Sequence, residues 1–200
     1  STVAVLIGNG VPAGLEVWVS TNTGSTWAKN ALPAPHDGES EGTLIFQGTR
    51  LIVGGENGEI LTAETPTGAW TSRLAGVETN HPQWLFAFVI SATVAVLVND
   101  NVHANSNMIA RTQDGGTTWT KIDGPSAWGG TNPTAATVIL IQGSLRWFVA
   151  GGNGSQVGKT LDGGSTWSAL TDLPLSGGRG MILSGSLLIA PLKSDANTLR

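Results

Sequence analysis

The chain has 200 residues, with 28 glycines, eight tryptophans, no cysteine and no tyrosine, and only 12% of its residues are charged. This length allows one domain with a sizeable core, and the composition is typical of an all-β protein rich in tight turns and opposite to that of a disordered chain. The net charge of −4 disfavours nucleic-acid binding, the lack of cysteine excludes disulfides and thiol chemistry, and the longest apolar run, residues 84–90, is strand-sized and too short to span a membrane.

Taken in chain order, the sequence predicts short strands throughout, and no stretch of ten or more residues has a helical period. The expected strands are 2–8, 15–20, 27–31, 42–47, 50–54, 59–63, 70–73, 83–90, 93–98, 108–112, 118–122, 137–142, 144–150, 156–160, 166–170, 180–184 and 187–192. They group into a single domain, 1–200, whose repeats span approximately 1–31, 42–73, 83–122 and 137–170, with a partial repeat at 180–200.

An eight-residue pattern recurs between the third and fourth strands of each repeat. It reads TLDGGSTW at 160–167, TQDGGTTW at 112–119 and STNTGSTW at 20–27, and a degenerate copy, AETPTGAW, occupies 63–70. The steps between its tryptophans are 43, 49 and 48 residues, which indicates an array of similar supersecondary units. The residues that carry the pattern are Asn22, Gly24, Trp27, Trp70, Asp114, Gly116, Trp119, Asp162, Gly164 and Trp167.

The residue types in this pattern predict a tight hairpin. Asp or Asn is expected to accept hydrogen bonds from backbone N–H groups two residues further on, and Gly to adopt a positive φ. The tryptophan then begins the fourth strand, where its large flat side chain can pack against the next unit. The role of these residues is therefore structural.

The pattern S/T-x-D-x-G-x-T-W resembles the Asp-box (BNR) repeat of sialidases, sortilin-type receptors and related β-propellers. Two copies match at every marked position, one has Asn22 for the aspartate, and in the fourth Thr65 replaces the aspartate and Gly68 is displaced by one position. The resemblance implies an all-β fold, a small β-propeller of four to five four-stranded antiparallel blades with Asp-box hairpins. It implies little about function, because in that family the Asp-box lies far from the binding centre.

The number of strands leaves ring closure open. The first repeat lacks its first strand, which residues 180–184 could supply, and residues 187–200 are then left over or form a partial fifth blade. Alternatively, these strands complete a neighbouring subunit, or the chain is part of a longer one. Because an unpaired strand edge invites association, we expect it to be covered.

The alternation of strand direction predicts that the second-to-third and fourth-to-first connections lie on the face opposite the Asp-box turns. Two of these loops, 30–41 and 123–136, are the longest, and long loops on a rigid scaffold often carry function. A tryptophan beside histidine, aspartate and asparagine suits a surface that binds sugar or peptide. The candidate ligand-binding residues of this loop face are His36, Asp37, His81, His103, Asn105, Trp128, Asn132 and Arg179. Ordinary solvated loops are the alternative.

The sequence gives little support for a metal or cofactor site. His36, His81 and His103 could bind zinc, but they belong to different repeats and show no short ligand spacing. Asp100, Asn101 and Asn105 lack the order of an EF-hand, so a role in stabilising a turn is favoured. Residues 152–160 look like a phosphate-binding loop but lead into a hairpin where a helix is required. We expect no metal and no cofactor.

Whether the chain is an enzyme stays open, and its residues weigh against it. The resemblance to sialidases implies a tyrosine nucleophile and an arginine triad; the chain has no tyrosine, and its arginines fall mostly in or at the ends of expected strands. Another propeller glycosidase would need two facing carboxylates. The loop candidates for that role are Asp37, Glu39, Glu41 and Asp123.

The leading hypothesis is a non-enzymatic recognition or assembly module that binds a glycan or a protein through the loop face, without nucleic acid or a membrane span, and in a homo-oligomer or larger assembly. Within that class we favour a virion or phage-tail structural component, in an extracellular or virion-associated setting, although the localisation is open. The alternative is a fragment or minimal form of a propeller glycoside hydrolase. A third hypothesis is an assembly factor similar to the photosystem-associated Asp-box propellers.

Overall fold

The fold was analysed in a computed structural model of the chain. The residues that it describes are 1–8, 14–33, 42–55, 58–74, 84–99, 109–122, 138–142, 146–151, 155–163, 165–166, 168–175, 182–184 and 187–189. Within these ranges, 17 strands form five antiparallel sheets, and no helix is present.

The sheets follow the order of the chain. The first contains β1 (Val3–Gly8), β2 (Leu15–Ser20) and β3 (Ala28–Asn30). The second contains β4 (Gly42–Gln47), β5 (Arg50–Gly55), β6 (Ile60–Ala63) and β7 (Trp70–Leu74). The third contains β8 (Trp84–Val89), β9 (Ala95–Asn99), β10 (Ile109–Thr112) and β11 (Thr120–Ile122). The fourth contains β12 (Val138–Gln142), β13 (Arg146–Gly151), β14 (Ser155–Thr160) and β15 (Ser168–Leu175). The last pairs β16 (Ile182–Ser184) with β17 (Leu187–Ile189).

Every strand expected from the sequence has a counterpart in the structure, and most bounds agree to within three residues. The largest difference is β15, which continues to Leu175, whereas the sequence predicted an end at residue 170. Trp27 and Trp119 lie one residue before β3 and β11 and do not begin them, unlike Trp70, which begins β7. The predicted all-β class with four-stranded antiparallel sheets is confirmed.

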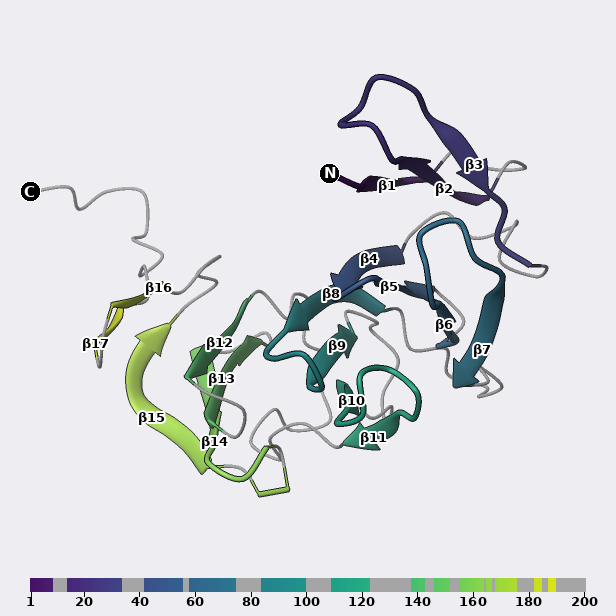
Figure 1. The fold of residues 1–200 in the computed structure, drawn as a ribbon. Helices are drawn as coiled ribbons and strands as arrows, with labels where there is room; N and C mark the ends of the chain where they lie inside the picture. The colour runs from purple at the N-terminus through teal and green to yellow at the C-terminus, as the bar shows by residue number, and fades with distance from the viewer. Residues whose placement is uncertain are drawn as a thin grey trace, which may run out of the picture.

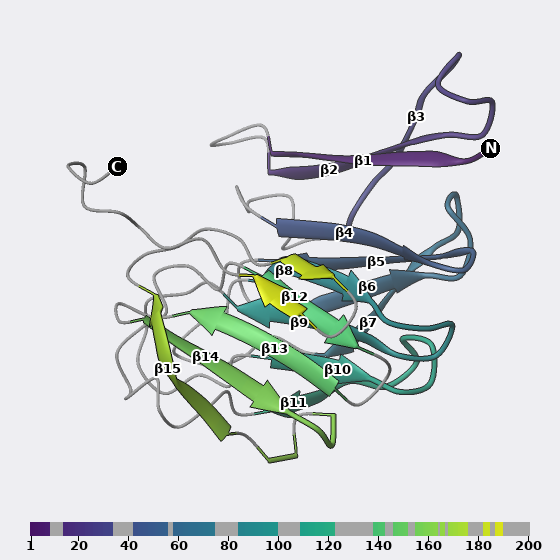
Figure 2. The ribbon, with the colours of Figure 1, turned by 90° about the vertical axis from the view of Figure 1, so that its left-hand side faces the viewer.

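The sheets follow one another around an arc (Figure 1). The first strands of the second and third sheets, β4 and β8, pack side by side on the inside of the arc, and β1 packs beside β4 (Figure 2). The fourth strands, such as β7 and β11, lie on the outside, where most of their residues are exposed or half-buried. The β16–β17 pair lies at the end of the arc away from β1 (Figure 1).

The first and second sheets pack face to face through apolar residues. Val17 of β2 is fully buried, and so are Leu51 and Val53 of β5. The strand β5 is a nearly continuous apolar run because both of its faces are covered: Leu51 and Val53 face the first sheet, and Ile52 faces the third. Burying one such side chain contributes about 1.5–3 kcal/mol. The buried residues of this interface are Val17, Val19, Leu51, Val53, Leu61 and Ala63.

The second and third sheets meet in the same way, with one close approach of the backbone. Trp84 at the start of β8 is fully buried and packs directly over Gly54 of β5. A Cβ added at Gly54 would lie 2.5 Å from Trp84 Cβ and 2.5 Å from Leu97 Cδ2, so only glycine fits there. The buried residues of this interface are Ile52, Ile60, Trp84, Ala95, Leu97, Ala110 and Trp119.

The first sheet has one strand fewer than the next three. Its order is β1-β2-β3, so it lacks the inner strand that β4, β8 and β12 provide in the other sheets. The sequence suggested that residues 180–184 could fill this position. Within the described ranges, β16 is hydrogen-bonded to β17, and no strand pairs with the free edge of β1.

Candidate functional site

Four hairpin turns lie at one edge of the sheets and carry the repeated sequence pattern; we call them the repeat turns. They comprise residues 20–27, 63–70, 112–119 and 160–167. Gly164 and Trp167 of the last turn lie outside the described residues. The polar side chains of these turns show what this edge of the molecule can do.

The turn at 112–119 is closed by its own side chains. Asp114 Oδ1 accepts hydrogen bonds from the backbone N–H groups of Thr117 at 3.0 Å and Thr118 at 2.9 Å. Asp114 Oδ2 accepts from the Thr118 hydroxyl at 2.7 Å. The Thr112 hydroxyl donates to Asp114 Oδ1 and accepts from Gly116 N–H at 2.8 Å. The sequence predicted that the carboxylate would reach two residues ahead, which is wrong, because it spans three and four.

These contacts leave the aspartates ionised. The pKa of Asp114 is lowered to about 2, mainly because the Thr118 backbone N–H and then its hydroxyl donate to the carboxylate. The pKa of Asp162 is also lowered to about 2, first by the Thr166 hydroxyl and then by the Thr166 backbone N–H. A general acid needs a raised pKa. Both carboxylates are therefore suited to holding a turn and not to proton transfer at neutral pH.

The first repeat turn keeps this geometry without a charge. Asn22 Oδ1 accepts from Thr26 N–H at 2.9 Å and from the Ser20 hydroxyl at 3.0 Å. The second carboxylate oxygen is replaced by Nδ2, which donates to Thr26 Oγ1 at 2.8 Å. Gly24 adopts a φ of 88°, the same as Gly116, as the sequence predicted for this position. An amide thus replaces the carboxylate because the threonine hydroxyl can either donate or accept.

The degenerate turn at 63–70 takes its support from the neighbouring sheet. Asn30, at the end of β3, donates from Nδ2 to Pro66 O at 2.9 Å and to Gly68 O at 3.1 Å. Its Oδ1 accepts from Trp70 Nε1 at 3.1 Å. Within the turn, Gly68 N–H donates to Thr65 O at 2.9 Å. The side chain of Asn30 therefore stabilises this turn from the neighbouring sheet, whereas Asp114 stabilises its turn from within it.

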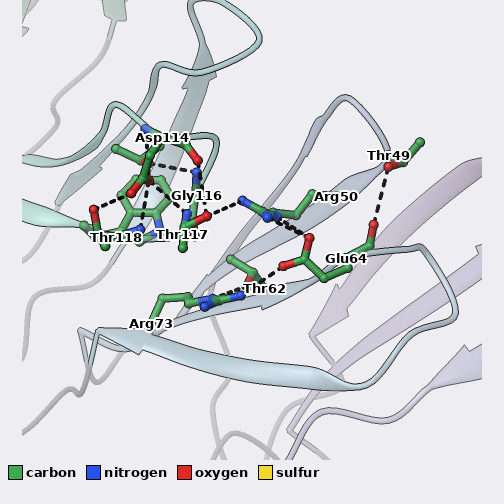
Figure 3. A network of polar contacts seen from close by, with 11 residues as sticks. Thr49, Arg50, Thr62, Glu64, Arg73, Asp114, Gly116, Thr117 and Thr118 are labelled. Atoms are coloured by element: carbon green, nitrogen blue, oxygen red, sulfur yellow. Dashed lines mark hydrogen bonds and ion pairs between the residues drawn. The ribbon is translucent and has the colours of Figure 1, made fainter.

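A charged network lies beside the repeat turns and was not anticipated from the sequence (Figure 3). Arg50 donates from Nε at 3.0 Å and from Nη2 at 2.6 Å to Glu64 Oε2. Arg73 donates from Nη2 to Glu64 Oε1 at 2.9 Å and from Nε to Thr62 Oγ1 at 2.8 Å. The pKa of Glu64 is lowered, mainly by the hydrogen bonds from Arg50. Two arginines converge on one carboxylate, but that carboxylate belongs to the chain itself.

The same network joins neighbouring sheets. Arg50 Nη1 also donates to Thr117 Oγ1 at 3.3 Å, in the repeat turn of the third sheet (Figure 3). Likewise, Arg111 of β10 in the third sheet donates a hydrogen bond to Gly163 O in the repeat turn of the fourth sheet. With Asn30, these contacts connect each of the first three sheets to the repeat turn of the sheet that follows it. The side chains of Asn30, Arg50 and Arg111 are thus used within the fold.

In the sequence, the predicted ligand-binding residues belong to connections between strands whose described ends lie at the opposite edge. The connections that follow β3, β7, β9, β11 and β15 all leave the sheets at that edge because the strands alternate in direction. His36, Asp37, His81, His103, Asn105, Trp128, Asn132 and Arg179 lie in these connections and outside the described residues. Their grouping into one surface stays a prediction.

The described part of the chain has neither a cluster of metal-ligating side chains nor a helix that could span a membrane. It contains no group of three His, Cys, Asp or Glu side chains that could hold a metal ion; the three histidines lie outside it. No helix in the same part is long and apolar enough to cross a membrane.

An arc of four-stranded antiparallel sheets that meet through their inner strands has the architecture of a β-propeller. Three of the solved structures that share this fold are the following. YCF48 bound to D1 peptide matches with 16% identity and a TM-score of 0.55, over 86% of this chain and 58% of that chain. The GH74 enzyme of Niastella koreensis matches with 17% identity and a TM-score of 0.60, over 88% and 29%. The GH74 xyloglucanase from Xanthomonas campestris matches with 12% identity and a TM-score of 0.61, over 90% and 30%.

At these identities the likeness establishes the fold alone. The chain spans 58% of the YCF48 structure and less than a third of the two GH74 enzymes. No protein-family model matches the sequence, and the comparison with curated proteins gives no match. The predicted β-propeller fold is confirmed.

Proposed function

We propose that the chain is a non-enzymatic recognition or assembly module, a propeller with Asp-box repeats that binds a protein partner or a glycan through the loop face opposite its repeat turns. One observation carries the proposal: at the repeat-turn edge, the side chains of Asp114, Asn22 and Arg50 are engaged in hydrogen bonds within the fold. Recognition is then left to the opposite edge, whose loops hold the sequence-predicted histidines, Trp128 and Asn132.

We favour a protein partner over a glycan because of one similar structure. YCF48 was solved with a bound D1 peptide, which shows that a propeller of this general architecture can present a peptide-binding surface. The third hypothesis from the sequence, an assembly factor, belongs to the same class. A virion or phage-tail setting is a finer form of the proposal and rests on the compact, cysteine-free and lysine-poor sequence.

The alternative function is glycoside hydrolysis, since two GH74 enzymes share the fold. Hydrolysis requires a general acid and a second carboxylate, about 5–10 Å apart. In the described ranges, each carboxylate with a resolved change of pKa, namely Glu64, Asp114 or Asp162, has a lowered pKa, which is the wrong direction for an acid. A catalytic pair would need loop carboxylates such as Glu39 and Asp123. Hydrolysis of xyloglucan that is lost in Glu39→Gln and Asp123→Asn would favour this alternative.

The proposal is tested by screening the purified chain against an array of short overlapping peptides and against a glycan array, followed by titration of the strongest binder. Trp128→Ala should weaken binding by about tenfold or more, equivalent to about 1.4 kcal/mol. Trp27→Ala is the matched control, because it removes an exposed tryptophan from the repeat-turn edge. Equal losses in both variants, or none in Trp128→Ala, would show that the loop face is not the binding surface.

A further inference from the structure

The two arginines beside the repeat turns have anchors other than the carboxylate between them (Figure 3). Arg50 begins β5, and its Nη1 donates to Thr117 Oγ1 at 3.3 Å in the repeat turn of the third sheet. Arg73 lies in β7, and its Nε donates to Thr62 Oγ1 of β6 at 2.8 Å. The side chains of Arg50 and Arg73 are only 17% and 20% exposed. The cationic half of the network is therefore positioned by the strands and by the neighbouring turn.

Two glycines of that neighbouring turn make room for Arg50. A Cβ added at Gly116 would lie 3.3 Å from Arg50 Cδ and 3.4 Å from Arg50 Nη1. A Cβ added at Gly115 would lie 3.6 Å from Arg50 Nη1. The side chain of Arg50 thus packs against the backbone of the third sheet's turn, and this packing holds its guanidinium at the edge of the second sheet.

Glu64 is the replaceable half of the network. Its side chain is 60% exposed. Within the described ranges, its carboxylate accepts hydrogen bonds from the two arginines alone, with Arg50 on Oε2 and Arg73 on Oε1. The equivalent position in the other repeat turns is uncharged and holds Thr21, Gln113 and Leu161. The turn therefore needs no carboxylate at this position, and water can solvate the one that is present as soon as it leaves the arginines.

The arginines outnumber the carboxylates that they hold. Two guanidinium groups face the single carboxylate of Glu64, while Asp114 in the neighbouring turn is bound by N–H and hydroxyl groups of its own turn. A guanidinium presents its donors in a fixed planar fork that matches a carboxylate. An exposed ion pair contributes little to stability, because water solvates both charges and salt screens them. A carboxylate from outside can therefore replace that of Glu64 with little loss of stability.

We propose that Arg50 and Arg73 form a further binding site, which takes the carboxylate of a glutamate or aspartate side chain of a partner protein and which Glu64 occupies in the free chain. The present occupant indicates the ligand, because the group between the two arginines is itself a glutamate side chain. The exchange keeps the charge of the site constant, since one carboxylate leaves for water as another enters. The proposal goes beyond the recognition function, because this site lies at the repeat-turn edge and not on the loop face.

NMR of the arginine side chains tests the proposal, since each Nε–H group gives its own signal. The full 200-residue chain is titrated with a capped Gly-Glu-Gly tripeptide, and the signals of Arg50 and Arg73 should both shift. Glu64→Gln should bind the tripeptide about tenfold more tightly than the wild type, because a tethered carboxylate competes at an effective concentration of about millimolar. Glu59→Gln is the matched control: it removes the same charge from the connection between β5 and β6, at the opposite edge of the same sheet, and should bind as the wild type does.

Three results would overturn the proposal. Equal affinities of Glu64→Gln and Glu59→Gln would show that removal of the internal carboxylate frees no site. The same shifts with a capped Gly-Gln-Gly tripeptide would show that the arginines do not recognise a carboxylate. Equally tight binding of acetate would show that the site takes free carboxylate ions and gains nothing from a protein side chain.

A second arm removes an arginine in place of the glutamate. Arg73→Gln should weaken binding of the tripeptide by about tenfold, because it removes a charged donor, whereas Lys121→Gln, which removes the same charge from β11, should not. Equal binding by the two variants would contradict the proposal. Trp128→Ala should bind the tripeptide as the wild type does, so a failure of this site and a failure of the loop face can be told apart.

Discussion

The repeat turns at 112–119 and 63–70 close the same kind of hairpin with different sets of contacts. The first is held by Asp114, whose carboxylate accepts from residues within its own turn. The second lacks an aspartate and is held by Asn30, which belongs to the neighbouring sheet. The 112–119 turn is closed mainly by its own side chains and receives one hydrogen bond from Arg50 of the second sheet, whereas the 63–70 turn depends on Asn30 of the first sheet for the contacts that Asp114 makes. A change in one residue of a repeat can therefore be compensated by a contact between repeats.

Removing the internal acceptor should have the largest effect. Asp114→Ala deletes the acceptor of two backbone N–H groups and a hydroxyl, and we expect the free energy of unfolding to fall by about 2 kcal/mol. The equivalent change in the degenerate turn, Thr65→Ala, should alter it by less than about 0.5 kcal/mol. Urea denaturation measures both. Equal losses would mean that the two turns do not differ in the way described.

Acid should weaken the self-closing turn through the same carboxylate. The folded-state pKa of Asp114, about 2, lies below its ordinary value of 3.8. A lowered folded-state pKa means that the stability it contributes is present above the ordinary value and is lost as the pH falls from about 4 towards 2. The difference in unfolding free energy between the wild type and Asp114→Asn should therefore shrink over that range. A constant difference from about pH 6 to about pH 2 would contradict this.

Removing the side chain of Asn30 should lower the free energy of unfolding somewhat less than removing that of Asp114. Asn30→Ala leaves the carbonyls of Pro66 and Gly68 without their donor and Trp70 Nε1 without its acceptor, and we expect a loss of about 1–2 kcal/mol. Asn30→Asp keeps the acceptor for Trp70 but removes the amide donor, so it should also destabilise the protein. Thermal unfolding compares the two variants with the wild type. A neutral Asn30→Ala would mean that the degenerate turn holds itself.

The smallest expected effect concerns the backbone of the first repeat turn. Thr23 has a φ of 63°, where two of the other turns have Gly115 at 71° and Gly163 at 69°. Since a left-handed conformation costs a residue with a side chain more than it costs glycine, Thr23→Gly should stabilise the protein by about 0.5 kcal/mol. The reverse change, Gly115→Thr, should destabilise it by about 1 kcal/mol. Chemical denaturation of both variants tests whether the turns are interchangeable.

The sequence revealed the strands and turns because they depend on local patterns. Alternating apolar residues in β2 and the Asp-Gly-Gly of the third turn each determine structure over a few residues, and the strand bounds matched. Asn30, and the Arg50–Glu64–Arg73 network, could not be predicted because their partners are set by how sheets pack, not by spacing along the chain. The candidate loop face was inferred from strand direction alone, and its residues lie beyond the described ranges.

The close contact over Gly54 has a consequence for the geometry of the whole arc. With no side chain at this position, the second and third sheets approach until the backbone meets Trp84 and Leu97. A larger side chain at this position would push the two sheets apart and widen the angle between them. Since a circular array closes only when its successive angles add up to a full turn, a methyl group at one residue could decide how many blades complete the circle.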